Sequence, residues 1–391
     1  MERLVTQRVL VAAGAAVTAG IAVYCLIRPA LGDLQLPGEK NRIIRARTRA
    51  EAAGKTSLPY PPDAFPGGRL VRSAYGDIQV FEWGPEDGEK VLLIHGIGTP
   101  CVALGGMAKE FVRSGCRVML FDLFGRGYSD APKDIPFDER LYTSQILLAI
   151  ASSPLAWTGP SAFHILGYSL GGALTAAFAT YHANLLRSVT MVCPGGIVRM
   201  SHIGWKSRLL YSPGLIPEAV LLALAKRRLR PQEGVPSADV PTDDNIEDDE
   251  VVDFDEVLVS PGVTVGDVVK WQLDGNDGFT PAYMSTIRSA PIYGQHKLLW
   301  KKFSEELAKR REKRDDSSDG GLESGRICLI LADKDPIVVA SEWVEDAKAV
   351  LGEEAVEIRI VKGGHEIAIS KGKEVARIAI DSWKKNRVNL E

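Results

Sequence analysis

The feature that most constrains the fold is a series of short apolar runs, separated from one another by segments with helical spacing. Runs such as "VLLIHG" and "RVMLFDLFG" show no alternation of polar and apolar residues, and they end in glycine. Continuous apolar runs are typical of parallel strands that are covered on both faces. We interpret "RLVRSAYGDIQVFEWG" as two further strands, and four later runs bring the predicted total to eight. The predicted helices are residues 102–114, 141–151, 170–181 and 341–351, which lie between strands, and 372–384, which follows the last strand.

This alternation predicts an α/β fold with a doubly wound, mostly parallel sheet of eight strands. The strand–helix alternation is interrupted once, between the sixth run, "SVTMVCPGG", and the seventh, "ICLILADKD". The segment between them is too long for a single helical crossover between two strands. We therefore expect a core of residues 68–197 and 326–391, with a helical cap inserted at 198–325. Within the cap, an acidic stretch that contains prolines predicts a disordered loop at about 231–256.

The N-terminal part of the chain differs in composition from the rest. Residues 9–27 are 19 consecutive residues without a charge, bounded by Arg8 and Arg28. About 20 apolar residues span the hydrocarbon core of a bilayer. We expect an uncleaved transmembrane anchor at 1–28, with a cleaved signal peptide or a buried helix as alternatives. Residues 29–67, which are charged and then proline-rich, predict a linker.

More basic residues follow the apolar segment than precede it. The positive-inside rule then predicts a single-pass protein whose main domain lies on the cytosolic face of an intracellular membrane. The net charge is −3 and 25% of the residues are charged, which gives no electrostatic reason to expect a nucleic-acid partner. The five cysteines are scattered, mostly within apolar runs, and favour buried thiols over disulfides or a metal site. Nothing in the sequence indicates an oligomeric state.

A serine stands at the junction between the run "FHILGY" and the helix-like segment "LGGALTAAFATY". The pattern Gly167-x-Ser169-x-Gly171 is short enough to arise by chance, so its meaning depends on its context. A serine on a tight strand-to-helix turn projects its hydroxyl into the crevice at the carboxyl edge of the sheet. The flanking glycines are needed because a Cβ there would collide with the neighbouring strand and helix. Ser169 is therefore a candidate nucleophile.

A serine nucleophile needs a base, and the base needs an orienting acid. Asp333 and Asp335 both follow a later predicted strand, in "LILADKDPIV". His365 ends the last predicted strand, in "EIRIVKGGHEIAI". All three lie at the carboxyl edge where open α/β sheets form their binding crevices, in the order serine, acid, histidine that the strand–turn–helix serine motif requires.

The same chemistry requires backbone N–H groups that stabilise an oxyanion. Leu170, directly after the serine, supplies one candidate donor, and Ile97 in the turn "HGIG" supplies the other. We interpret His95, in the same turn, as a structural ring that bonds local backbone rather than as a second base.

From about residue 68 to 386 the chain resembles the α/β-hydrolase superfamily, in "LLIHGIG", "FDLFGRGYSD", "GYSLGG", "ADKDPIV" and "KGGHE". The resemblance selects Asp335 over Asp333, because the family's acid directly precedes the x-Ile-Val element. Ala332, where many members carry Gly, is a departure that leaves this assignment in place. The residues that the resemblance implies are the nucleophile Ser169, the acid Asp335, the base His365 and the oxyanion donors Ile97 and Leu170.

The resemblance implies a serine hydrolase that cleaves carboxylic esters of lipids or other apolar acyl groups through an acyl-enzyme on Ser169, without a metal or cofactor. Two alternatives remain open: a thioesterase-like enzyme acting on a secondary-metabolite intermediate, and a non-catalytic binding protein on the same fold. The single anchor followed by this domain also resembles membrane-bound monoacylglycerol lipases.

Substrate choice is expected to depend on the cap. The basic cluster Lys226–Arg230 can contact anionic lipid, or it can simply complement a helix C-terminus. Six aromatic residues can line an acyl pocket or pack within the cap, and we favour packing for most of them. They are Trp205, Tyr211, Trp271, Phe279, Tyr283 and Tyr293.

Overall fold

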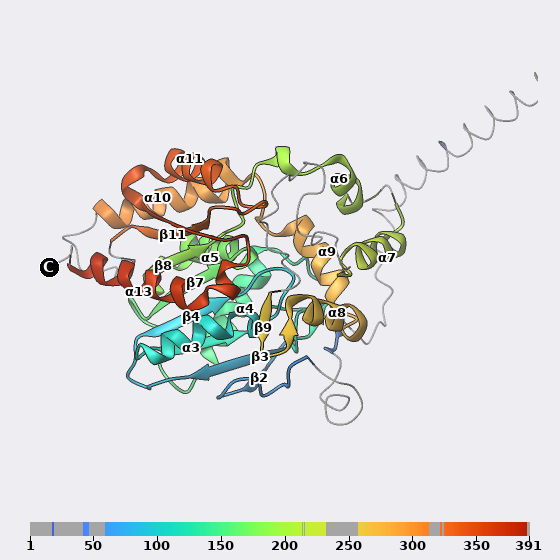
Figure 1. Ribbon diagram of the computed structural model, residues 1–391, viewed down its shortest axis with the longest axis horizontal. Helices are drawn as coiled ribbons and strands as arrows, with labels where there is room; N and C mark the ends of the chain where they lie inside the picture. The colour runs from blue at the N-terminus through green and yellow to red at the C-terminus, as the bar shows by residue number, and fades with distance from the viewer. Residues whose placement is uncertain are drawn as a thin grey trace, which may run out of the picture.

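The computed structural model describes residues 42–46, 59–212, 214, 216–231, 257–312, 321–322 and 324–388, together with Thr18. Its centre is an eight-stranded sheet in the order β12-β11-β8-β7-β4-β5-β3-β2 (Figure 1). The strands are β2 (Arg69–Ser73), β3 (Gly76–Trp83), β4 (Lys90–Ile94), β5 (Arg117–Phe121), β7 (Phe163–Tyr168), β8 (Leu186–Val192), β11 (Ile327–Ala332) and β12 (Val356–Val361). Only β3 pairs antiparallel, with β2 and with β5, which confirms the predicted mostly parallel sheet.

The central strands are buried along almost their whole length, as their continuous apolar sequences require. Their register brings the carboxyl ends level with one another. Ile94 of β4 lies opposite Gly167 of β7, and Tyr168 lies opposite Val192 of β8. Ala332 of β11 lies opposite the last residue of β12 in the same way. Loops that follow these strands therefore meet at one edge of the sheet.

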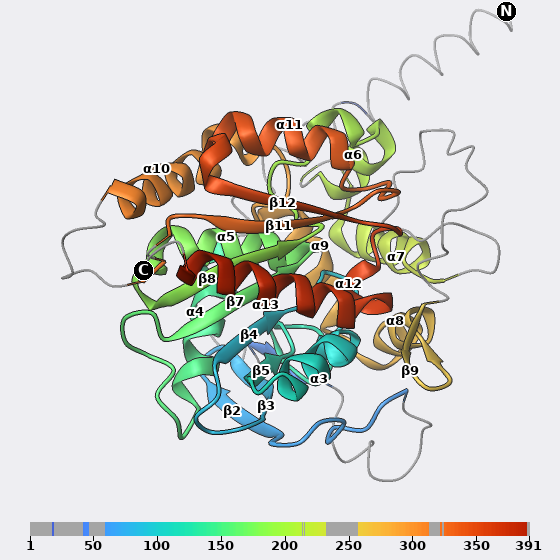
Figure 2. The ribbon, with the colours of Figure 1, turned by 60° about the vertical axis from the view of Figure 1, so that its left-hand side comes forward.

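Helices cover both faces of the sheet, as Figure 2 shows. On one face α3 (Gly105–Arg113) packs against α13 (Gly372–Val388). On the other face lie, in successive contact, α4 (Glu139–Ala151), α5 (Leu170–His182), α10 (Leu299–Glu312) and α11 (Ala340–Leu351).

The helices of the core lie where the sequence predicts them, with small differences at their ends. Helix α4 begins two residues earlier than predicted, because the side chain of Asp138 accepts hydrogen bonds from the backbone N–H groups of Arg140 and Leu141. Residues Cys101–Leu104 form a separate 3₁₀ turn before α3. The predicted helix at 102–114 is therefore divided into two elements.

Between β8 and β11 the chain forms α6 (Trp205–Tyr211), α7 (Glu218–Arg228), the hairpin β9 (Leu258–Ser260) and β10 (Val263–Thr264), α8 (Val265–Gly275) and α9 (Phe279–Ser289). Helices α6, α7 and α9 contact one another, and α8 contacts α9. Helix α10 lies in the range expected for the cap, yet it packs on α5 and α11 of the core layer. The acidic loop predicted at about 231–256 lies, apart from its first residue, outside the described residues.

At the N-terminal end, β1 (Ile43–Ile44) pairs antiparallel with β6 (Ala131–Pro132). Tyr60 and Phe65, which lie in the range expected for a linker, are buried in the core against other aromatic rings. The apolar segment 9–27 lies outside the described residues, apart from Thr18. Among the residues that are described, no helix is long and apolar enough to cross a membrane.

Candidate active site

Ser169 lies in the turn between β7 and α5, with a positive φ of 54° that is uncommon for a residue with a side chain. Its backbone is fixed from both sides. Its N–H donates to Val192 O at 3.0 Å, and its carbonyl accepts from the N–H of Gly195 at 2.9 Å. A strained backbone that the surroundings hold in place is characteristic of functional sites.

The two glycines of the motif are required by close packing. A Cβ on Gly167 would lie 2.1 Å from the carbonyl oxygen of Gly171, and a Cβ on Gly171 would lie 2.2 Å from that of Ile94. No side chain fits at either position without moving the backbone of α5 or β4. The local sequence thus determines a turn that carries the Ser169 hydroxyl at the carboxyl edge of the sheet.

His365 and Asp335, predicted as base and acid, lie beside this serine. His365 Nε2 is 3.0 Å from Ser169 Oγ, and His365 Nδ1 is 2.7 Å from Asp335 Oδ2. The other carboxylate oxygen of Asp335 accepts the backbone N–H groups of Ile337 and Val338, both at 2.8 Å. Since a carboxylate only accepts, His365 Nδ1 carries the proton and Nε2 is left to accept one from Ser169.

The second aspartate has a different position. Asp333 Oδ1 accepts the backbone N–H of Gly363 at 2.8 Å, in the loop that leads to His365. Asp333 therefore braces that loop, while Asp335 contacts the imidazole. The structure places the two carboxylates in separate roles that the local sequence alone left open.

Ile97 and Leu170 line the same pocket as Ser169 and His365. Gly96 lies against the serine, since a Cβ on it would be 3.4 Å from Ser169 Cβ. The turn that carries Ile97 is thus held close to the candidate nucleophile. The use of the Ile97 and Leu170 N–H groups as oxyanion donors stays a prediction.

Two polar side chains near this turn escaped the sequence analysis. Arg126 is fully buried and donates to Ile97 O at 3.2 Å, to Phe124 O at 2.9 Å and to Thr286 Oγ1 of α9 at 3.0 Å. Gln272 of α8 donates to Gly98 O and accepts from Gly127 N–H, both at 2.9 Å. These residues connect the cap to the turn beside Ser169. The sequence offered only an arginine in the glycine-rich segment "FGRGY", with Asp122 and Asp130 nearby and nothing to indicate a partner in the cap.

One group of side chains has spacing compatible with a metal ion. Cys193, Asp335 and His365 each offer an atom within 4.8 Å of the others. The Asp335 and His365 atoms already hydrogen-bond each other. Burial, and then the nearby Asp335 carboxylate, raises the pKa of the Cys193 thiol well above its usual range. Because metals bind the thiolate, this cluster is poorly suited to hold one.

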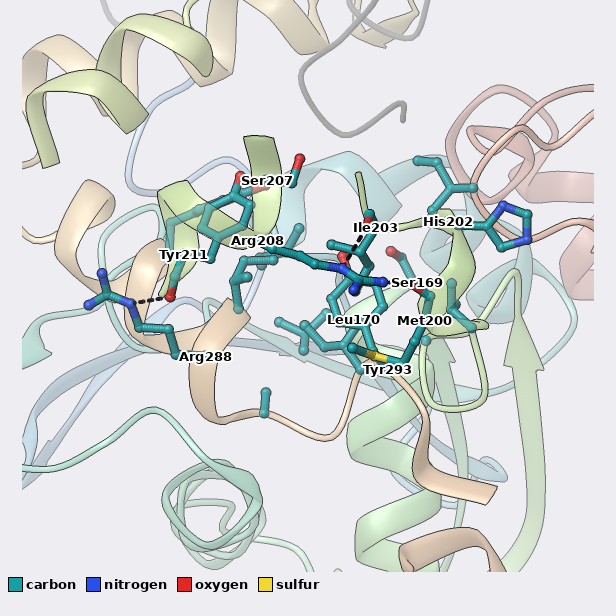
Figure 3. A pocket seen from close by; sticks show the side chains of 18 of the residues that line it. Ser169, Leu170, Met200, His202, Ile203, Ser207, Arg208, Tyr211, Arg288 and Tyr293 are labelled. Carbon is teal, nitrogen blue, oxygen red and sulfur yellow. Dashed lines mark hydrogen bonds between the residues drawn. The ribbon is translucent and has the colours of Figure 1, made fainter. Parts of the chain in front are cut away.

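The pocket in front of Ser169 has a volume of about 420 Å³. Its lining combines the strand ends with cap residues, and it includes three of the six aromatic residues singled out from the sequence, namely Tyr211, Tyr283 and Tyr293. Tyr211 and Tyr293 are labelled in Figure 3. Trp205 is instead 69% exposed, and Trp271 packs against other aromatic rings. About half of the remaining lining residues are aliphatic or Met, which suits the apolar part of a ligand, and most of the others are polar or basic.

Comparison with known proteins agrees with this architecture. The family model described as "alpha/beta hydrolase fold" matches residues 90–372. A protein of Arabidopsis thaliana described as "Probable lysophospholipase BODYGUARD 4" is 28% identical over 148 residues, which are 37% of this chain and 31% of that protein. The chain thus spans less than a third of this relative's length.

Two solved structures resemble the fold over most of their length. A carboxylesterase structure from the thaumarchaeon Nitrososphaera gargenis has a TM-score of 0.56 at 15% identity, covering 82% of this chain and 100% of that one. A bacterial membrane phospholipase A has a TM-score of 0.53 at 16% identity, covering 99% of each chain. At such identities the likeness shows the fold alone. With the family model matching most of its length, the chain belongs to the α/β-hydrolase fold family.

Proposed function

We propose that this protein is a serine hydrolase that cleaves carboxylic esters with apolar acyl groups through an acyl-enzyme on Ser169. The observation that carries the proposal is the continuous hydrogen-bonded chain Ser169–His365–Asp335, which opens into a pocket with aliphatic and aromatic walls as well as polar ones. The nucleophile–base and base–acid contacts have the geometry that nucleophilic catalysis needs.

In the proposed reaction, His365 Nε2 takes the Ser169 proton as Ser169 Oγ attacks the ester carbonyl carbon. The carbonyl oxygen becomes an oxyanion that accepts the N–H groups of Ile97 and Leu170. The intermediate collapses, the alcohol leaves with the proton from His365, and water then hydrolyses the acyl-enzyme by the same route. Asp335 holds the imidazole in the required tautomer and stabilises its protonated form.

Labelling with a fluorophosphonate probe tests the nucleophile directly. We expect Ser169 of the wild type to be labelled, and Ser169→Ala to lose labelling together with roughly 10⁴–10⁶-fold of the rate constant kcat for ester hydrolysis. Ser144→Ala, on α4, is a matched control because, among the described residues, the Ser144 hydroxyl bonds its own helix alone, at Arg140 O. An unlabelled but folded wild type would refute the proposal. A labelled protein that turns over neither esters nor thioesters would favour a binding role instead.

We further propose that residues 9–27 anchor the protein in a membrane by one span. The support is the sequence: 19 residues without a charge between two arginines, a length close to that of the hydrocarbon core. The full chain should resist extraction from membranes by alkaline carbonate, and a chain lacking residues 1–28 should not. Protease protection in sealed vesicles then tests the proposed cytosolic orientation, which predicts that the hydrolase domain is accessible from outside.

A further inference from the structure

We propose that the pocket accepts an ester that also carries an anionic group, bound by Arg208 and Arg228 of the cap. This inference rests on the proposed function and names the substrate class of the same site. The shared chemistry is a phosphate or a carboxylate on an otherwise apolar ester, with the phosphate on the alcohol side or the carboxylate at the far end of the acyl chain.

Each of three cap helices contributes one arginine to the pocket. Arg208 comes from α6, Arg228 from α7 and Arg288 from α9, and these helices pack against one another. Among the residues that the structure describes, no aspartate or glutamate lines the pocket. The lining is therefore aliphatic and aromatic with an excess of positive charge beside Ser169.

The hydrogen bonds of these arginines separate them into two kinds. Arg288 forms an ion pair with Glu218, with 2.8 Å between Nη1 and Oε1. Among the described residues, Arg208 donates to neutral groups alone, the carbonyl oxygens of Ile203 at 2.9 Å and Met200 at 2.8 Å. These bonds hold the guanidinium so that, in the view of Figure 3, the side chain extends from α6 toward Ser169.

Arg228 also has a neutral partner. It donates to Ser207 Oγ at 3.0 Å, and within the described part of the chain neither it nor Arg208 forms a salt bridge. A guanidinium carries five N–H donors in a planar fork that matches carboxylate and phosphate oxygens. The bonds to backbone and hydroxyl groups orient both guanidinium groups and leave donors for an anionic ligand.

Complementing the C-terminal dipole of α7 does not account for this arrangement. Lys226 and Arg227 lie in the same last turn, are exposed, and supply positive charge to the helix end without entering the pocket. Arg230 pairs with Asp274 instead. The basic cluster predicted at Lys226–Arg230 is thus divided, and Arg228 is its member that lines the site.

Arg208 is exposed and Arg228 is half-buried, so water still reaches both guanidinium groups, and an anionic ligand would take the place of that water. A phosphate or carboxylate would accept charge-assisted hydrogen bonds from the N–H donors that the protein partners leave open. The aliphatic lining, which includes Ile287, Ile292 and Val338, would hold the acyl chain. An amphiphilic ester can use both the guanidinium donors and the aliphatic lining, whereas a neutral ester can use only the aliphatic lining.

The test compares three esters with the same decanoyl length: decanoylglycerol, decanoylglycerol phosphate, and a decanoylglycerol analogue whose acyl chain ends in a carboxylate. For each we compare kcat/KM in the wild type, Arg208→Gln, Arg228→Gln and the control Arg227→Gln. The wild type should prefer an anionic ester over the neutral one. Each pocket variant should lower that preference roughly tenfold to a hundredfold, the loss expected for a charge-assisted hydrogen bond. Arg227→Gln should keep it.

If the phosphate ester shows the arginine-dependent preference, the anion lies on the alcohol side. If the ester with the terminal carboxylate shows it, the anion lies on the acyl side. A wild type that hydrolyses the neutral ester best, or pocket variants with unaltered preference, would overturn the inference while leaving the proposed function standing. Calorimetry of the three esters binding to Ser169→Ala tests the reverse outcome, in which the inference holds and the hydrolase proposal fails. Arg208- and Arg228-dependent binding of an anionic ester without turnover by the wild type would keep the inference and refute the hydrolase proposal.

Discussion

His95 lies directly after β4, in the turn that carries Gly96 and Ile97. Its Nε2 accepts the backbone N–H of Leu123 at 2.8 Å, so the proton resides on Nδ1, which donates to Gly96 O at 2.7 Å. Burial, together with the nearby positive charge of Arg126, lowers the pKa of this histidine to about 3. A neutral imidazole thus joins the turn beside Ser169 to the loop after β5, in agreement with the structural interpretation made from the sequence.

This low pKa predicts an acid-dependent loss of stability. In the unfolded chain His95 titrates near 6.5, so the unfolded state takes up a proton first. The stabilisation is therefore present above pH 6.5 and declines as the pH falls toward 3. Between pH 7 and pH 5 it should decrease by about 2 kcal/mol.

The measurement is the free energy of unfolding in urea at both pH values for the wild type and for His95→Gln. The advantage of the wild type over the variant should shrink by that amount at pH 5. Burial raises the pKa of Asp122 to about 6, so Asp122 contributes to stability in the opposite direction as the pH falls. This contribution is present in both proteins and cancels when the variant's free energy of unfolding is subtracted from that of the wild type at each pH. An advantage that does not change with pH would contradict the assigned protonation state.

Helices α8 and α9 attach the cap to the core through side chains rather than through sheet pairing. Thr286 of α9 bonds Arg126 and Tyr142, and Gln272 of α8 bonds the turns at Gly98 and Gly127. Arg126 in turn bonds the carbonyl of Ile97, so its side chain links α9 to the predicted oxyanion turn. The cap therefore contributes to the geometry at Ser169 as well as to the walls of the pocket.

A double-mutant cycle on Arg126 and Thr286 tests this connection. Arg126→Met should cost roughly 2–5 kcal/mol of stability, because Ile97 O, Phe124 O and Tyr142 lose a buried charged donor. Thr286→Val should cost roughly 1–3 kcal/mol. The double variant should be more stable than the sum of the two losses predicts, by at least about 0.5 kcal/mol. Strictly additive losses would show that the two side chains act independently.

At the scale of the whole molecule, one buried carboxylate, Asp130, helps to hold the described segment before β2 against the domain. Arg45 pairs with Asp130 at 2.6 Å, and Ala46 N–H donates to the other oxygen of the same carboxylate at 2.8 Å. Asp130 also accepts the N–H of Asp77 and lies beside the β1–β6 pair. This buried carboxylate therefore joins the N-terminal segment, strand β3 and the loop after β5.

Two arginine substitutions compare this contact with an ordinary surface pair. Arg45→Ala should lower the free energy of unfolding by about 1 kcal/mol, because the Asp130 carboxylate is only 6% exposed and loses a charged donor. Arg42→Ala, which removes a pair with Asp134 in which the arginine is 76% exposed, should change it by less than about 0.5 kcal/mol. Equal effects in urea unfolding would show that Arg45 contributes no more than a surface charge.

The sequence by itself determined the features that depend on local sterics and on the period of apolar residues. The continuous apolar runs predicted the sheet strands, and the sterically required glycines predicted the turn that carries Ser169. The order of Ser169, Asp335 and His365 at strand ends was also sufficient to predict that they meet, since parallel strands share one carboxyl edge.

Only the tertiary structure decided how the cap joins that edge. Arg126 and Thr286 are 160 positions apart, and no periodic pattern connects them. Arg228 lies within a cluster of basic residues, and the packing of α7 on α6 and α9 is what selects it for the pocket. Such contacts depend on how helices from distant parts of the sequence pack against one another. That packing is fixed only when the whole chain folds.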